Sequence, residues 1–182
     1  IEKLFGTLTI PFGDREIDFS GDWPRVTFRE LILKHSDIDI EVDNTKEKLL
    51  ARILEKKIEL ESETPLENLG FGNLVDVLYK KVARPFMIEP VYLTEHPTSL
   101  SPLARSNDER KEISDRFQLV INGAEIVNGY SELVDPIEQE KRLLEQASLK
   151  AAGDSEVRFS MTQSGWTVQN MEILRLISSS IG

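Results

Sequence analysis

Residues 117–133 read FQLVI, then Asn122-Gly123, then AEIVNGYSEL. An Asn-Gly pair between two alternating runs is the strongest short signature of a β-hairpin, because a type I′ turn needs positive φ at both central residues. Regular pairing outward from this turn places Gln118 opposite Val127. The segment therefore predicts two antiparallel strands, around which the remaining elements are arranged.

Helices are expected between residues 24 and 84, upstream of the hairpin. Thr27 and Glu30 have the spacing of a capping box at the start of a short helix. Apolar residues at helical spacing then predict amphipathic helices over residues 45–60 and about 73–83. These helices form a contiguous helical block between β segments.

Strands are expected on both sides of this block. Residues 3–10 and 15–19 predict a hairpin, and residues 86–93 predict a strand in which Pro90 requires an edge position or a bulge. The polar residues 95–116 are expected to form a long loop with a helical turn near 109–114.

A further helix is expected to begin at Asp135-Pro136 and to run to about residue 152, where Gly153 ends it. Residues 155–182 form a less regular tail with a weak helical stripe. The sequence therefore predicts one α+β domain over residues 1–182, an antiparallel sheet with helices inserted at about 24–84.

Composition excludes several classes of protein. The 182 residues include 22 Lys+Arg and 32 Asp+Glu, a formal charge of −10, which argues against a broad nucleic-acid-binding surface and leads us to expect no binding of DNA. No run reaches the roughly 18 apolar residues of a membrane span. The absence of cysteine excludes disulfides and thiolate metal sites, as is typical of a cytoplasmic protein.

The second hairpin strand carries Asn128, Tyr130 and Glu132 at alternate positions, so that they project from one face. An amide, an aromatic ring and a carboxylate on one face could hold an ammonium or amino-acid ligand. The competing interpretation is a strand with an ordinary solvated polar face. Glu125 would join them only if a bulge lay between Ile126 and Gly129.

The motifs resemble a known family. HPTSLSPLARS (96–106) and DRFQLVINGAEIVNGYSELVDPIEQEKRLLEQ (115–146) resemble the region of class II lysyl-tRNA synthetases that precedes their third signature motif. FGDREIDFSGDWPRVTFRELI (12–32) resembles the segment that follows the second motif. The likeness extends over about residues 10–153, and the combination is far more specific than any one element.

The resemblance implies activation of lysine with ATP and Mg²⁺, followed by transfer to tRNA. It implies that Asn128, Tyr130 and Glu132 line the lysine pocket, with Glu132 facing the ε-ammonium, and that Glu125 binds ATP and metal. Gln118 stands where the family usually has a second metal-binding glutamate, so it keeps an oxygen but loses a charge. We expect this loss to weaken Mg²⁺ binding.

Segments resembling the three class II motifs are not found, which leads us to expect a partial catalytic domain that does not form adenylate alone. A non-catalytic, synthetase-derived interaction module is the alternative of a different class. An aspartyl- or asparaginyl-type relative is a further alternative, which the charge of Glu132 disfavours. Exposed sheet edges are expected to favour self-association as a homodimer.

Overall fold

The computed structural model describes residues 1–155 and 157 of the chain. Within them the strands form a two-stranded sheet, β1-β2, and a four-stranded sheet in the order β3-β4-β5-β6. The strands are β1 (Thr9–Phe12), β2 (Arg15–Asp18), β3 (Arg25–Thr27), β4 (Val91–Pro97), β5 (Ile113–Ile121) and β6 (Ala124–Tyr130).

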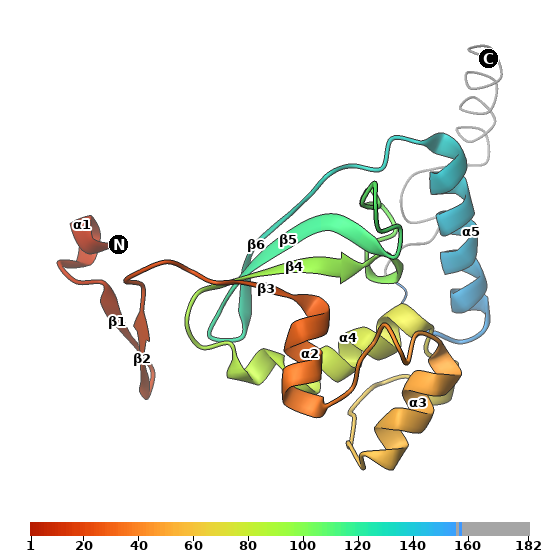
Figure 1. Ribbon diagram of the computed structural model, residues 1–182, viewed down its shortest axis with the longest axis horizontal. Helices are drawn as coiled ribbons and strands as arrows, with labels where there is room; N and C mark the ends of the chain where they lie inside the picture. The colour runs from red at the N-terminus through yellow and green to blue at the C-terminus, as the bar shows by residue number, and fades with distance from the viewer. Residues whose placement is uncertain (156, 158–182) are drawn as a thin grey trace.

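Helices and strands alternate irregularly along the chain, which confirms the predicted α+β class (Figure 1). The α-helices are α1 (Glu2–Phe5), α2 (Phe28–Ser36), α3 (Lys46–Glu55), α4 (Phe71–Val82) and α5 (Pro136–Ala151). Short 3₁₀ turns are η1 (Leu66–Asn68), η2 (Arg84–Phe86) and η3 (Thr98–Leu100). Three of the helices, α2, α3 and α4, lie within the interval 24–84, and whether this block is an insertion stays a prediction.

The larger sheet is mixed. Strand β4 pairs antiparallel with β5, and β5 pairs antiparallel with β6, as expected. Strand β3 pairs parallel with β4, however, because the chain that connects them crosses back through the helical block and re-enters the sheet in the same direction. The helical block is therefore the crossover between two neighbouring strands of the sheet.

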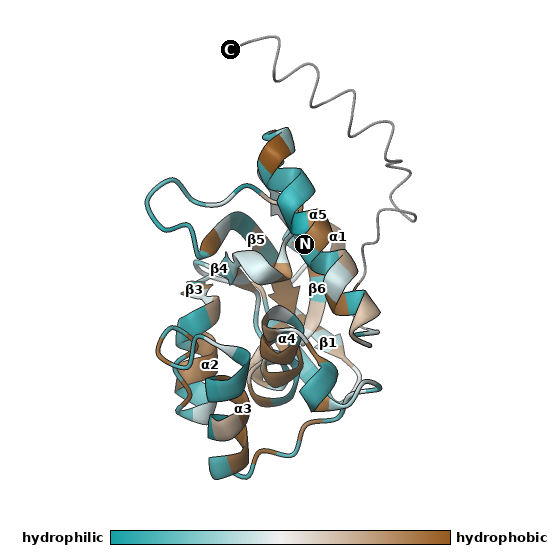
Figure 2. Cartoon of the chain, turned by 90° about the vertical axis from the view of Figure 1, so that its right-hand side faces the viewer, coloured by the Kyte–Doolittle hydropathy of each residue, from teal (hydrophilic) through white to brown (hydrophobic). Residues whose placement is uncertain are grey.

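The core lies between the helical block and one face of this sheet. Helix α4 is the central element, with Leu74, Val75 and Leu78 fully buried. Figure 2 shows α4 largely in the colour of hydrophobic residues, beside α2 and α3. Leu93 of β4 and Val120 of β5 complete the same cluster from the sheet. Burial of this apolar surface fixes α4 beneath the strands that carry the candidate site.

Local sequence signals place the starts of α2 and α5 correctly. The Thr27 hydroxyl oxygen accepts from the backbone N–H of Glu30, and the Glu30 carboxylate accepts from the backbone N–H of Thr27, so the predicted capping box is confirmed. Asp135 accepts from two first-turn amides of α5, and Gly153 follows that helix with φ 97°. The predicted end of α3 at residue 60 is wrong: Lys57 has a φ of 55°, in the left-handed region, and the helix ends at Glu55.

The expected strand over residues 86–93 is displaced. Pro90 cannot donate a ladder hydrogen bond, and β4 begins at the next residue, Val91. The expected loop over 95–116 contains the end of β4, the turn η3 and the start of β5. Where a helical turn was predicted, at 109–114, there is no helix but one hydrogen-bonded turn, in which the Ile113 N–H donates to the Arg110 carbonyl at 3.2 Å. The first predicted hairpin is present but shorter, since residues 2–5 are helical.

The β1-β2 hairpin lies to one side of the main body in Figure 1. The backbone N–H of Asp18, at the end of β2, donates to the Glu89 carboxylate at 2.7 Å. The tail predicted for residues 155–182 falls outside the described residues apart from 155 and 157. Among the described residues, none of the helices has both the length and the apolarity needed to cross a membrane.

Candidate functional site

A β-bulge decides which side chains of β6 share a face. Val120 lies opposite Glu125 and Leu119 opposite Val127, so Ile126 has no partner on β5. The predicted pairing of Gln118 with Val127 is therefore wrong, because this extra residue moves Gln118 opposite Asn128. The bulge lies at the start of the interval predicted to contain it, and it brings Glu125 to the face that carries Asn128 and Tyr130.

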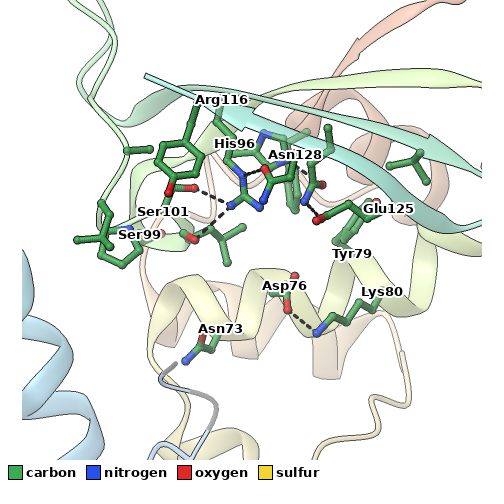
Figure 3. Close-up of a pocket in the computed structure, with 18 of the residues that line it drawn as sticks. Asn73, Asp76, Tyr79, Lys80, His96, Ser99, Ser101, Arg116, Glu125 and Asn128 are labelled. Atoms are coloured by element: carbon green, nitrogen blue, oxygen red, sulfur yellow. Dashed lines mark hydrogen bonds and ion pairs between the residues drawn. The ribbon is translucent and has the colours of Figure 1, made fainter. Parts of the chain in front are cut away.

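These three side chains line a cavity of about 300 Å³ between the sheet and α4 (Figure 3). Strands β4 and β5 contribute the roof, α4 the floor, and residues 99–104 one wall. The polar lining residues are Asn73, Asp76, Tyr79, Lys80, Arg84, His96, Ser99, Ser101, Arg116, Gln118, Glu125, Asn128, Tyr130 and Gln146.

Arg116 fixes the orientation of Asn128. Its Nε donates to the Asn128 Oδ1 at 3.0 Å, and its Nη1 donates to the Ser101 Oγ at 2.8 Å. Because the amide oxygen of Asn128 is engaged, its NH₂ group is left to donate to a bound molecule. Arg116 also ties β5 to the cavity wall that carries Ser101.

A second chain of hydrogen bonds joins β4, β5 and β6. The His96 Nε2 lies 3.1 Å from the Gln118 Oε1, and the Gln118 Nε2 donates to the Glu125 Oε2. His96 is 1% exposed and packs against Phe28, with ring centroids 5.3 Å apart. Burial is the main cause that lowers the pKa of His96 to about 4, so the ring is neutral at pH 7.

The floor of the cavity is polar as well. Lys80 forms an ion pair with Asp76, one turn earlier on α4, at 2.6 Å. The Tyr79 hydroxyl donates to the Met87 sulfur at 3.4 Å, and burial raises the pKa of Tyr79 to about 12. The phenol is thus a neutral group at the edge of the cavity.

Glu132 lies outside the cavity lining. Its side chain is exposed, and its backbone forms an antiparallel bridge with Ala104, which does line the cavity. Asn128 and Tyr130 are therefore inside the cavity and Glu132 is next to its wall. The role of Glu132 toward an ammonium group stays a prediction.

Two residues that position the wall were not found by sequence reasoning. Arg142 of α5 is 6% exposed and donates to the Ala104 carbonyl at 2.8 Å and to the Ser106 Oγ at 2.7 Å. Gly72 lies in the first turn of α4, where an added Cβ would come within 2.6 Å of the Ser99 carbonyl oxygen. Any side chain at position 72 would therefore meet the backbone of η3.

The donor set at Glu125 does not fit a divalent cation. Mg²⁺ prefers several oxygen ligands, whereas the Gln118 side chain presents its nitrogen to Glu125 and its oxygen to His96. Within residues 1–155 and 157, no group of three or more His, Cys, Asp or Glu side chains could hold a metal ion. We therefore derive no metal-dependent step from this site.

The α+β fold is consistent with a fragment of a class II aminoacyl-tRNA synthetase core, and the sequence agrees. Residues 1–165 match the family described as tRNA synthetases class II (D, K and N), and the chain belongs to this family.

Its similar relatives within the family are lysine–tRNA ligases. The enzyme of Thermosipho africanus is 39% identical over 158 residues, covering 87% of this chain and 30% of the relative. That of Pasteurella multocida is 40% identical over 160 residues, covering 86% of this chain and 31% of the relative. The chain thus spans less than a third of the length of these relatives, and its similarity covers the whole of the candidate site.

Proposed function

We propose that this chain forms the amino-acid-binding part of a lysine-activating class II synthetase, and that its cavity binds lysine. One observation carries the proposal: the bulge at Ile126 brings Glu125, Asn128 and Tyr130 to one face, where they open into a cavity of about 300 Å³. The similarity to lysine–tRNA ligases supports the choice of substrate.

Each side chain has a physical role in this proposal. Tyr130 is 46% exposed, and its ring can face a cation or the aliphatic stem of lysine. The NH₂ group of Asn128, held by Arg116, can donate to a carbonyl or carboxylate oxygen. Glu132, at the wall next to Ala104, supplies the anion for the ε-ammonium group.

Calorimetry with the 182-residue chain tests the substrate. We expect saturable binding of lysine and none of aspartate or norleucine, since the first reverses the side-chain charge and the second lacks it. Glu132→Gln removes one charge-assisted bond and should weaken lysine binding about tenfold. Equal heats for lysine and norleucine would exclude the proposed recognition.

Tyr130 offers a matched pair of variants for the same experiment. Tyr130→Phe keeps the aromatic ring and should bind lysine within about twofold of the parent chain, whereas Tyr130→Leu removes the ring face and should bind several-fold more weakly, because a cation–π contact contributes about 1 kcal/mol. Equal losses in both variants would argue for a role of the hydroxyl instead.

We further propose that ATP and tRNA are substrates of the whole synthetase and that this chain alone does not form lysyl-adenylate. Adenylyl transfer needs cations positioned on the phosphates. The cationic side chains that line the cavity are each held by the protein: Lys80 by Asp76, Arg84 by the Gly123 carbonyl and Arg116 by Asn128. Lysine-dependent pyrophosphate exchange by the purified chain, lost in Glu132→Gln, would refute this proposal.

The proposal also covers compartment and assembly. The cytoplasm is the proposed compartment, in keeping with a role in protein synthesis. Self-association as a homodimer is also proposed, supported by β6, which is an edge strand of the described sheet and exposes Ile126 and Val127. Sedimentation analysis of the chain tests the oligomeric state.

A further inference from the structure

The orientation of the Gln118 amide is determined by its two neighbours. Its Nε2 donates to the carboxylate of Glu125, and its Oε1 lies 3.1 Å from the His96 Nε2. The opposite orientation would place the amide oxygen against the carboxylate oxygen, and two hydrogen-bond acceptors in contact repel each other. The negative charge of Glu125 therefore selects the orientation that directs nitrogen toward it.

His96 reinforces this choice. Its Nδ1 is buried and has no hydrogen-bond partner among the described residues. A buried N–H without an acceptor is rarer and more costly than an acceptor without a donor, so the proton belongs on Nε2. His96 then donates to the Gln118 Oε1, and the two contacts hold the amide in one orientation.

We propose that Gln118 takes the place of a bound cation beside Glu125, with His96 as the positioning residue, so that this site takes no divalent cation. The NH₂ group of Gln118 occupies the side of Glu125 that faces residue 118, where a cation bridging the two side chains would lie. The one oxygen that Gln118 could offer points to His96 instead. This inference does not rest on lysine binding.

Manganese is a suitable probe, because free Mn²⁺ is measured directly by electron paramagnetic resonance. The acidic surface of the parent chain can bind Mn²⁺ weakly, and we expect Glu125→Gln to leave this binding unchanged. Gln118→Glu restores a second carboxylate and should gain a site at least tenfold tighter, and that site should disappear when Glu125→Gln is added. The matched control is Glu59→Gln, in the segment between α3 and α4 and outside the cavity lining.

Loss of Mn²⁺ binding on Glu125→Gln in the parent chain would overturn the proposal. This comparison does not require the Gln118→Glu variant to fold. The Mn²⁺ measurement is also independent of the proposed lysine binding. Lysine calorimetry can show no binding while Glu125→Gln leaves Mn²⁺ binding unchanged, and lysine can bind even if Glu125→Gln abolishes Mn²⁺ binding.

The side-chain amide signals of Gln118 give an independent readout by nuclear magnetic resonance. One amide proton bonded to Glu125 should resonate downfield, exchange slowly with water and keep its linewidth when Mn²⁺ is added. Glu125→Gln should move this signal upfield. His96→Phe removes the donor to the Gln118 Oε1 but keeps a ring against Phe28, and it should accelerate the exchange of the amide proton with water. Selective broadening of this signal by substoichiometric Mn²⁺ would contradict the proposal.

Discussion

The guanidinium of Arg142 on α5 donates to the backbone carbonyl of Ala104 at 2.8 Å, although the two residues are 38 positions apart. The same side chain reaches Ser106 and forms an ion pair with Glu138 at 3.0 Å. Since Ala104 lines the cavity and its backbone pairs with that of Glu132, α5 holds the wall of the candidate site through one buried arginine.

Arg142→Met should therefore loosen this wall. The change leaves a buried carbonyl without its donor, and we expect a loss of about 1–3 kcal/mol in the free energy of unfolding. Hydrogen exchange should accelerate at the amides of residues 103–106. Arg105→Met is the control, since the Arg105 side chain is exposed and pairs only at the surface with Asp108, and it should change stability by less than about 0.5 kcal/mol. Similar effects of the two variants would argue against a role of Arg142 in holding the cavity wall.

Gly72→Ala tests the close approach of α4 to η3. Alanine is favoured over glycine in a helix by about 1 kcal/mol, so an unconstrained position would become more stable. Here the new Cβ would come within 2.6 Å of the Ser99 carbonyl oxygen, which belongs to the backbone. We expect a net loss of about 1–3 kcal/mol in thermal or urea unfolding, since η3 must shift. A stabilised variant would show that the two segments are not in contact.

His96 makes stability depend on pH. Its pKa is lowered to about 4 in the folded chain, against 6.5 for an ordinary histidine. Between pH 4 and 6.5 the histidine is therefore protonated in the unfolded chain but neutral in the folded chain. As the pH falls from 6.5 to 4, the free energy of unfolding should fall by about 3 kcal/mol. Asp39, whose pKa the hydrogen bond from Arg29 lowers below 3.8, titrates below this window.

The measurement is the free energy of unfolding in urea at half-unit steps of pH. His96→Gln places an amide Nε2 near the position of the ring Nε2, so it keeps a donor for Gln118 but does not titrate, and its curve should be flatter than that of the parent by the same amount. Parallel curves for the two proteins would contradict the assigned cause.

Arg116→Leu should weaken lysine binding through Asn128. Without the Arg116 Nε, the Asn128 amide loses the bond that fixes its orientation, and we expect an increase of about fivefold in the dissociation constant, equivalent to one hydrogen bond of roughly 1 kcal/mol. Calorimetry of the double variant, Arg116→Leu with Asn128→Ala, tests whether Arg116 acts through Asn128. If it does, the loss of binding free energy in the double variant should be smaller than the sum of the losses in the two single variants. Full additivity would show that Arg116 acts elsewhere.

Local features of the structure were predictable from the sequence. The Asn122-Gly123 turn, with φ of 48° and 69°, forms the expected hairpin, and the capping residues Thr27 and Asp135 start their helices. The bulge was predictable because side chains alternate along a strand, so that Glu125 can share the face of Asn128 only if one extra residue lies between them. These signals depend on residues within a few positions of one another, where backbone sterics and hydrogen bonding decide the outcome.

Long-range relationships were not predictable in this way. The parallel pairing of β3 with β4, the contact of Gly72 with Ser99 and the reach of Arg142 to Ala104 join segments that are distant in the sequence. No periodicity encodes them, because they depend on how the helical block packs against the sheet. The orientation of the Gln118 amide is of the same kind, since it follows from Glu125 and His96 on the two neighbouring strands.

The central claim, that the cavity holds lysine against Asn128 and Tyr130, is tested most directly by nuclear Overhauser contacts between lysine and the chain. The account predicts contacts from the side-chain methylenes of lysine to the Tyr130 ring, which disappear in Tyr130→Leu and persist in Tyr130→Phe. Contacts that place lysine elsewhere on the molecule, or that persist unchanged in Tyr130→Leu, would contradict it.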